Sequence, residues 1–259
     1  MATYKKRGGK PKTKKEKQDK IEEESTTAEV FNTLDQSASK TEEFVSKYQN
    51  VIIGVIVVAI VGVLAFLGYN RFIVEPQQEE ASNELNQSQI YFDQALESSS
   101  SKERDSLFTL AINGNQGKFG FLDIASEYSN TKAGDLANYY AGISYLNIGK
   151  YQEAITYLEA FKADDEIIST FAVGSIGDAF LQLEQPEEAI DYFEKAANRR
   201  DNTYTTPKYL FKAALAALEL EDADKAVKHL EKIKSKYPDS EEAQKLAPYL
   251  GKAKAMKSS

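Results

Sequence analysis

The sequence predicts an all-α protein in which a single N-terminal transmembrane helix is followed by an α-solenoid, a stack of helical hairpins. Two observations lead to this prediction. A charge-free apolar run extends from Val51 to Tyr69, and a pattern of small and aromatic residues recurs about every 35 residues from Gly142 onward. Repeats of this length are typical of hairpins that bury their apolar faces only against their neighbours. The expected parts are a basic, largely disordered cytoplasmic tail (1–47), a transmembrane helix (48–71), a helical stalk with atypical first repeat helices (72–132), and helical repeats with a closing helix (133–259).

The tail before the apolar run is basic at its start. Its first twenty residues contain nine Lys or Arg against two acidic residues. A segment of this composition cannot bury a core, which is why we expect disorder. Weak contact with anionic lipid or with the ribosome is compatible with its charge, and a topology signal without a specific partner is the simpler alternative.

The apolar run is long enough to cross a bilayer. Its nineteen residues would extend roughly 28 Å as a helix, close to the hydrocarbon thickness of roughly 30 Å. Thirteen of them are Val, Ile, Leu or Phe, which together favour insertion by roughly 4 to 8 kcal/mol. A buried strand is disfavoured because strands usually contain about 3 to 10 residues. The residues expected to face lipid include Val51, Ile56, Ile60, Leu64 and Tyr69.

A cleaved signal peptide is a further alternative for this run. Fifty residues precede it, however, and no small-residue cleavage pattern follows it, so we expect the anchor to stay attached. Lys40 and Lys47 lie within twenty residues on its N-terminal side, whereas Arg71 alone lies within twenty on the other. Because cytoplasmic flanks carry the excess of Lys and Arg, we expect a single-pass protein of the inner (plasma) membrane. Its N-terminus would be cytoplasmic and its C-terminal domain periplasmic or otherwise extracytoplasmic.

The composition gives little support for catalysis or for nucleic-acid binding. The chain lacks Cys, and its one histidine, His229, is expected to be an ordinary surface or rim residue on a charged helix. Gly174 and Ser175 are adjacent, whereas a nucleophile elbow requires a spacer between them. The region after Tyr69 carries a net charge of −10, which disfavours nucleic-acid binding there. We therefore expect no catalysis, no cofactor, no metal and no small-molecule substrate.

The segment after the apolar run has helical spacing. Apolar residues between Ala81 and Leu96 recur at near-helical intervals, and Pro76 stands where a helix would begin. Two shorter helical patterns follow, around Arg104–Ile112 and Phe119–Tyr128. The glycines between them, Gly114, Gly117 and Gly120, do not have the spacing of a phosphate-binding loop and predict a turn between helices.

The repeats after this segment resemble the tetratricopeptide repeat family, in which small residues stand where two helices approach closely. The first copy matches the family motif at Gly142, Tyr145, Tyr151 and Ala154, with Leu158 and Phe161 in place of the usual Phe and Ala. The second matches at Gly177, Ala189, Phe193 and Ala196, with Phe180 for Tyr. The third matches at Ala226 and Pro238, with Ala214 for Gly and Ala217 for Tyr. The segment Asp239–Lys254 is expected to be the polar closing helix, with Pro248 as a candidate kink.

The segment that leads into the first repeat extends the resemblance. It looks like the junction in membrane-anchored repeat proteins of the ancillary Sec translocon subunit type (YfgM-like), at Phe121, Ile124, Ala125, Tyr128, Thr131 and Ala133. This resemblance covers roughly residues 45–255. It implies a non-enzymatic scaffold whose outer domain binds protein partners, either the Sec translocon or chaperones of secreted proteins. The alternative is a membrane-tethered regulator that sequesters a soluble envelope or stress-response factor.

The resemblance also implies where a partner would bind. In such repeats the first helix of each hairpin lines a concave groove, which a segment of another protein can occupy. Transferring that register predicts a partner-binding groove formed by Tyr139, Ile143, Asn147, Asp178, Gln182 and Phe211. The alternative for the same positions is core between repeats.

Overall fold

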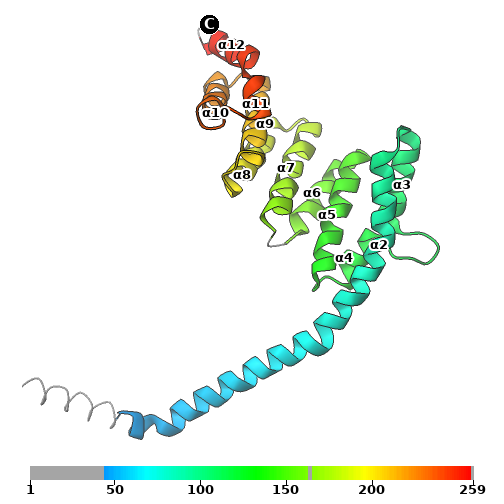
Figure 1. Ribbon diagram of the computed structural model, residues 1–259, viewed down its shortest axis with the longest axis vertical. Helices are drawn as coiled ribbons and strands as arrows, with labels where there is room; N and C mark the ends of the chain where they lie inside the picture. Colours follow the sequence, from blue (N-terminus) through cyan, green and yellow to red (C-terminus); the bar gives the residue numbers. More distant parts are fainter. Residues whose placement is uncertain (1–43, 163–164, 258–259) are drawn as a thin grey trace, which may run out of the picture. The chain divides into compact units, whose positions relative to one another are not determined.

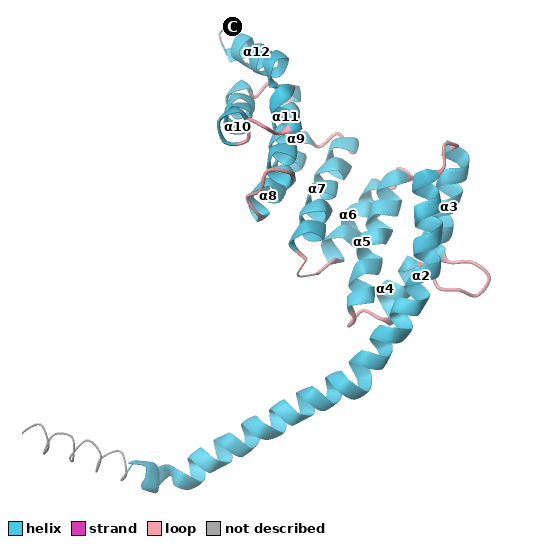
Figure 2. Ribbon diagram, in the orientation of Figure 1, coloured by secondary structure: helices cyan, strands magenta, loops and turns pink. Residues whose placement is uncertain are grey.

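The computed structural model describes residues 44–162 and 165–257, and within them every regular element is a helix (Figure 2). This confirms the all-α prediction. The chain divides into two compact units at Gly68 and Tyr69. The predictions of a disordered tail and of its contacts with lipid or ribosome fall almost entirely on residues 1–43, outside the described residues.

The apolar run lies in the first unit except for Tyr69, the residue with which the second unit begins. The backbone is helical without a break from Phe44 to Glu97, and the most apolar window of this helix has a mean hydropathy of 3.1 with no residue buried. Val51 is 63% exposed, Ile56 51%, Ile60 53%, Leu64 62% and Tyr69 47%. A continuous apolar surface of this kind is unfavourable in water and favourable in lipid. It is the one helix of the described chain that is long and apolar enough to cross a membrane, which is consistent with a single-pass membrane protein.

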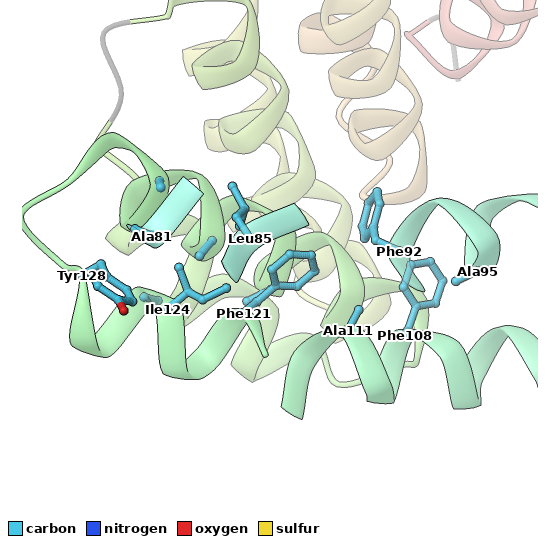
Figure 3. Packing of buried hydrophobic residues seen from close by; sticks show 13 residues of the cluster. Ala81, Leu85, Phe92, Ala95, Phe108, Ala111, Phe121, Ile124 and Tyr128 are labelled. Atoms are coloured by element: carbon cyan, nitrogen blue, oxygen red, sulfur yellow. The ribbon is translucent and has the colours of Figure 1, made fainter. Parts of the chain in front are cut away.

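The second unit begins with a π-helical turn, η1 (Asn70–Val74), and two helices that pack on each other, α2 (Glu75–Glu97) and α3 (Ser101–Asn113). Their shared core is aromatic. Phe92 of α2 meets Phe108 of α3 edge to face, with ring centroids 5.5 Å apart (Figure 3). After a turn at Gly114 and Gly117, both with positive φ, the short helix α4 (Phe121–Glu127) adds Phe121 to the same cluster.

Helix α2 is packed onto the repeats. Ala81 and Leu85 are buried in the same cluster as Ala137 and Ala141 of α5 (Lys132–Asn147). The side-chain oxygen of Gln78 also accepts a hydrogen bond of 2.7 Å from the backbone N–H of Lys132. The segment predicted as a stalk is therefore bound to the first repeat from Gln78 onward.

Three helical hairpins form the rest of the stack (Figure 1). They are α5 with α6 (Tyr151–Ala160), α7 (Glu166–Gln182) with α8 (Pro186–Arg199), and α9 (Thr205–Glu219) with α10 (Ala223–Lys236). Each helix packs mainly on the one before it and the one after it. Side chains cap the starts of several of them: Thr131 accepts from the N–H of Gly134, and Asp222 accepts from that of Lys225.

The two helices of a hairpin meet at a small residue. A methyl group built on Gly142 would lie 2.5 Å from Cγ of Leu158, and one on Gly177 would lie 2.6 Å from Cε1 of Phe193. No side chain can be accommodated at either contact unless Leu158 or Phe193, or the helix that carries it, moves. The predicted close approach at these two glycines is confirmed.

The closing segment differs from the single helix that was predicted. It consists of two helices, α11 (Glu241–Gln244) and α12 (Leu246–Lys257), which meet at Lys245. Pro248 lies in the first turn of α12, where the missing N–H costs no hydrogen bond of the helix. The interruption thus comes three residues before the proline, and Pro248 does not kink a continuous helix.

Candidate functional site

The predicted groove residues of α5 are only partly available to a partner. The ring of Tyr139 is half-buried against Phe161, with centroids 5.5 Å apart, and Ile143 is half-buried between two core clusters. Asn147 is exposed, and its side-chain N–H donates to the backbone oxygen of Ile143 at 2.8 Å. Two of these three side chains therefore contribute to core between repeats.

The predicted residues of α7 and α9 are held by contacts within the stack. Asp178 accepts two hydrogen bonds from Nζ of Lys212, at 2.6 and 2.7 Å, which link α7 to α9. Gln182 is exposed and accepts from the hydroxyl of Tyr151 at 3.2 Å, and Phe211 meets Tyr249 of α12 edge to face at 5.2 Å. A groove along these positions stays a prediction.

A pocket that the sequence did not indicate lies between the N-terminal ends of α7 and α9. It encloses about 300 Å³ and is lined by Glu166, Ile167, Thr170, Arg200, Asn202, Tyr204 and Thr205. We call it the inter-repeat pocket, because α7 belongs to the second hairpin and α9 to the third. Its size is at the lower end of the range of about 300 to 1,000 Å³ that is usual for ligand sites.

Two walls of the inter-repeat pocket are exposed apolar side chains. Tyr204 is 68% exposed and Ile167 is 59% exposed, the highest values for large apolar side chains among the described residues from 75 to 257. The ring of Phe171, one turn after Ile167 on α7, meets that of Tyr204 edge to face at 6.4 Å. Apolar residues that gather on a surface in this way commonly mark a site of interaction.

Asn202 fixes the loop that carries Tyr204. Its Oδ1 accepts from the backbone N–H groups of Tyr204 (2.8 Å) and Thr205 (2.7 Å), which satisfies two donors at the start of α9. Its Nδ2 donates to the backbone oxygen of Arg200 (2.9 Å) and to Oγ1 of Thr205 (2.6 Å). The hydroxyl of Tyr237 further donates to Asp201. The loop is therefore held in one shape before any partner arrives.

Of the cationic side chains on the loop and on α9, two form ion pairs with carboxylates of the described chain and one does not. Arg200 forms an ion pair with Glu166, and Lys212 is paired with Asp178. Nζ of Lys208 lies 5.3 Å from the ring centroid of Phe171 and 5.9 Å from that of Tyr209, and no carboxylate of the described residues lies within 4.0 Å of it. Among the described residues, the contacts that stabilise the charge of Lys208 are therefore these two aromatic faces.

The helices on either side of the pocket are fixed to each other further along. The buried ring of Tyr209 lies against Gly174, and burial, with a smaller contribution from the charge of Asp178, raises the pKa of Tyr209 far above its usual value. The phenol therefore stays neutral, and this contact contributes packing to the wall between repeats.

His229 is buried, and the prediction of a surface or rim residue is wrong. Its side chain is 4% exposed, and Nε2 lies 2.9 Å from Oε1 of Glu194 on α8, at an angle that does not give a well-directed hydrogen bond. Burial lowers the pKa of His229, while Glu194 opposes that shift. Within the described residues, no group of three or more His, Asp and Glu is placed to hold a metal ion.

Comparison with known proteins agrees with this arrangement of hairpins. The tetratricopeptide repeat matches residues 136–165, 172–203 and 208–240, and each match falls on one hairpin. A comparison with curated proteins found no match. Among the described residues, the three segments that match the tetratricopeptide repeat are therefore the hairpins α5–α6, α7–α8 and α9–α10.

Proposed function

We propose that this chain is a membrane-anchored scaffold whose repeat domain binds protein partners outside the cytoplasm. Tetratricopeptide repeats generally provide surfaces for other proteins, and the apolar helix of the first unit provides an anchor. The observation that carries the proposal is the inter-repeat pocket, where the exposed side chains of Ile167 and Tyr204 stand beside a loop that Asn202 holds rigid. Such a surface suits a segment of another protein.

The partner that we propose is the Sec translocon or a chaperone of secreted proteins at the inner membrane. The support is the resemblance between the YfgM-like proteins and the segment from Phe121 to Gly142. The structure gives this segment a role in the stack, because Phe121 and Ile124 join the core that connects α2, α3 and α5. The anchor would keep the domain close to proteins that emerge from the membrane.

Protease treatment of sealed inverted membrane vesicles tests the orientation. The domain from Tyr69 onward should be protected in intact vesicles and cleaved once detergent opens them. Cleavage of the domain in intact vesicles would mean that it lies on the cytoplasmic side, and the proposed location would be wrong.

Crosslinking in cells tests the partner. A photo-reactive residue at Tyr204 or Ile167, beside the inter-repeat pocket, should form adducts with translocon components or envelope chaperones, and one at Ile56 should report partners within the membrane. Gln152, exposed on α6, serves as the control position. Adducts with a small soluble factor alone would favour the tethered-regulator alternative. Equal adducts from Tyr204 and Gln152 would contradict binding at the pocket.

A further inference from the structure

We infer that the inter-repeat pocket receives one bulky apolar side chain of a partner protein, and that Lys208 pairs with an acidic residue next to that side chain in the partner's sequence. This inference rests on the proposed function, since it specifies the chemistry of the segment that the scaffold would bind. It assigns a specificity to a place that neither the repeat motif nor the predicted groove identifies.

The first argument is size and lining. A pocket of about 300 Å³ that opens between Ile167 and Tyr204 has room for a single large side chain and its immediate backbone. The surface that lines it is mainly apolar, because the hydroxyls of Thr170 and Thr205 are buried and already bonded to the Glu166 backbone oxygen and to Nδ2 of Asn202. Phe, Leu or Trp would cover the exposed apolar surface of both walls, and burial of that surface is the main gain.

The second argument is rigidity. A flexible loop would lose conformational freedom on binding, which weakens affinity. Here Asn202 makes four hydrogen bonds through its side chain, two of them to the backbone N–H groups of Tyr204 and Thr205. Tyr204 itself is a rigid aromatic residue with a hydroxyl, the type that dominates binding energy at protein interfaces.

The third argument is charge complementarity. Arg200 lines the pocket and is paired with Glu166, and Lys212, further along α9, is paired with Asp178. Lys208 lies between them in the sequence, on α9, one turn after Thr205 of the pocket lining. It has no carboxylate partner within 4.0 Å among the described residues, and it is half-buried over Phe171. A carboxylate of the partner would supply the missing charge, whereas a Lys or Arg at the same place would be repelled. We therefore commit to an acidic neighbour for the apolar anchor.

Selection of peptides on the intact protein tests the inference. A random peptide library displayed on phage is selected against the full-length chain in lipid nanodiscs, after removal of binders to empty nanodiscs. We expect enriched peptides to share Phe, Leu or Trp with Asp or Glu within a few residues. Binding of an enriched peptide should weaken by about tenfold or more with Ile167→Asp. Gln152→Asp, which adds the same charge to the exposed face of α6, should leave binding unchanged.

Reversing the charge of Lys208 tests whether this residue determines the preference for acidic peptides, independently of any loss of folding. Selection on Lys208→Glu should replace the enriched Asp or Glu by Lys or Arg and retain the apolar anchor. Thermal unfolding of each variant verifies that the repeats remain folded. An unchanged acidic preference with Lys208→Glu, or full binding with Ile167→Asp, would overturn the inference while leaving a protein-binding scaffold in place. A library without enriched binders, together with the absence of crosslinks from Tyr204, would overturn both the inference and the proposed function.

Discussion

The ring of Tyr209 in α9 packs directly against Gly174 in α7. A methyl group built on Gly174 would lie 2.0 Å from Cε1 and 2.2 Å from Cζ of that ring. Tyr209 is 2% exposed, so the ring has no open space into which it can withdraw. The contact joins the first helices of two successive repeats, and it therefore fixes the distance between the helices that enclose the inter-repeat pocket.

Gly174→Ala should destabilise the stack at this contact. The added methyl group must displace the ring or separate the two helices, which typically costs about 1 to 3 kcal/mol. We expect a lower midpoint of thermal unfolding, followed by circular dichroism of the purified chain in detergent. Gly251→Ala is the matched control, because no atom lies within 4 Å of a methyl group there and alanine favours a helix. Equal midpoints for the two variants would contradict the expected overpacking.

Sequence patterns predict contacts within a hairpin better than contacts between hairpins. Gly142 and Gly177 were identified because the family motif places a small residue there, and each meets its large partner on the next helix. Gly174 belongs to no such motif, and its partner Tyr209 is 35 residues away in the following repeat. Such a pairing depends on how the hairpins stack, and stacking is determined by the whole set of side chains at the interface.

The burial of His229 predicts a pH dependence of stability. Burial lowers the pKa of His229 below its ordinary value of 6.5, with Glu194 raising it and Lys228 and Lys232 lowering it further. The unfolded chain therefore binds a proton at a higher pH than the folded chain does. The stability that this residue contributes is therefore present above about pH 6.5 and is lost progressively as the pH falls from there toward the lowered pKa of the folded state.

Urea unfolding at pH 7.5 and 5.5 measures this effect against a variant. His229→Gln keeps a polar side chain and removes the titration, so the wild-type protein should lose more stability between the two pH values than the variant does. Carboxylates other than Glu194 contribute equally to both proteins and cancel in the difference, which leaves the contribution of His229 together with its neighbour Glu194. A wild-type protein that gains stability relative to the variant on acidification would show that Glu194 outweighs burial.

The error about His229 has a physical origin. The sequence around it, from Lys225 to Lys236, is rich in lysine, which is typical of a solvated helix. The helix is amphipathic, however, and its buried residues include Ala226, Leu230 and Ile233 together with the histidine. The sequence alone does not show whether the histidine lies on the buried face or at its edge, because this depends on how α8 packs against α10.

The pair formed by Asp178 and Lys212 should make a small, salt-sensitive contribution to stability. Both side chains are about one third exposed, at 33% and 31%, so solvent screens their attraction. A double-mutant cycle with Asp178→Asn and Lys212→Gln should give a coupling of about 0.5 to 1 kcal/mol that decreases at high salt. Glu241 and Lys245, 4.0 Å apart and far more exposed, form the control pair, for which no measurable coupling is expected. A coupling for Asp178 and Lys212 that salt leaves unchanged would contradict a screened ion pair.

The apolar helix should tolerate one charge but not two. Insertion is favoured by roughly 4 to 8 kcal/mol, and each Lys near the middle of the helix costs about 2.5 to 3.5 kcal/mol. Ile60→Lys alone should therefore remain in the membrane. Ile56→Lys combined with Ile60→Lys costs about 5 to 7 kcal/mol, which removes most or all of the preference for lipid, so alkaline extraction should release a large part of this variant. Leu64→Phe, which keeps the surface apolar, is the control. Retention of the double variant in the membrane fraction would argue against this helix as the anchor.

The sequence pattern did not predict the inter-repeat pocket. Its apolar wall includes Tyr204, which lies outside the helical periodicity of the repeats, in the loop before α9. The sequence does contain one relevant pattern, the run from Asn202 to Thr206, which is rich in Asn and Thr. Side chains of these types commonly form hydrogen bonds with nearby backbone groups. Such a run predicts a structured turn, but only the approach of α7 makes that turn one side of a pocket.

The hydrogen bonds of Asn202 lead to the last prediction. Asn202→Ala removes Oδ1, the one atom that accepts from the N–H groups of both Tyr204 and Thr205, and loss of a side chain that caps a helix costs about 0.5 to 2 kcal/mol. Amide hydrogen exchange at Tyr204 and Thr205 should accelerate, and crosslinking from Ile167 should weaken because Tyr204 loses its fixed position. Asn202→Asp keeps the acceptor for these N–H groups but loses the Nδ2 donor to Arg200 and Thr205, so its exchange rates should lie between those of the wild type and Asn202→Ala. If the alanine variant exchanges these amides as slowly as the wild type, the loop is held by other contacts, such as that between Asp201 and Tyr237.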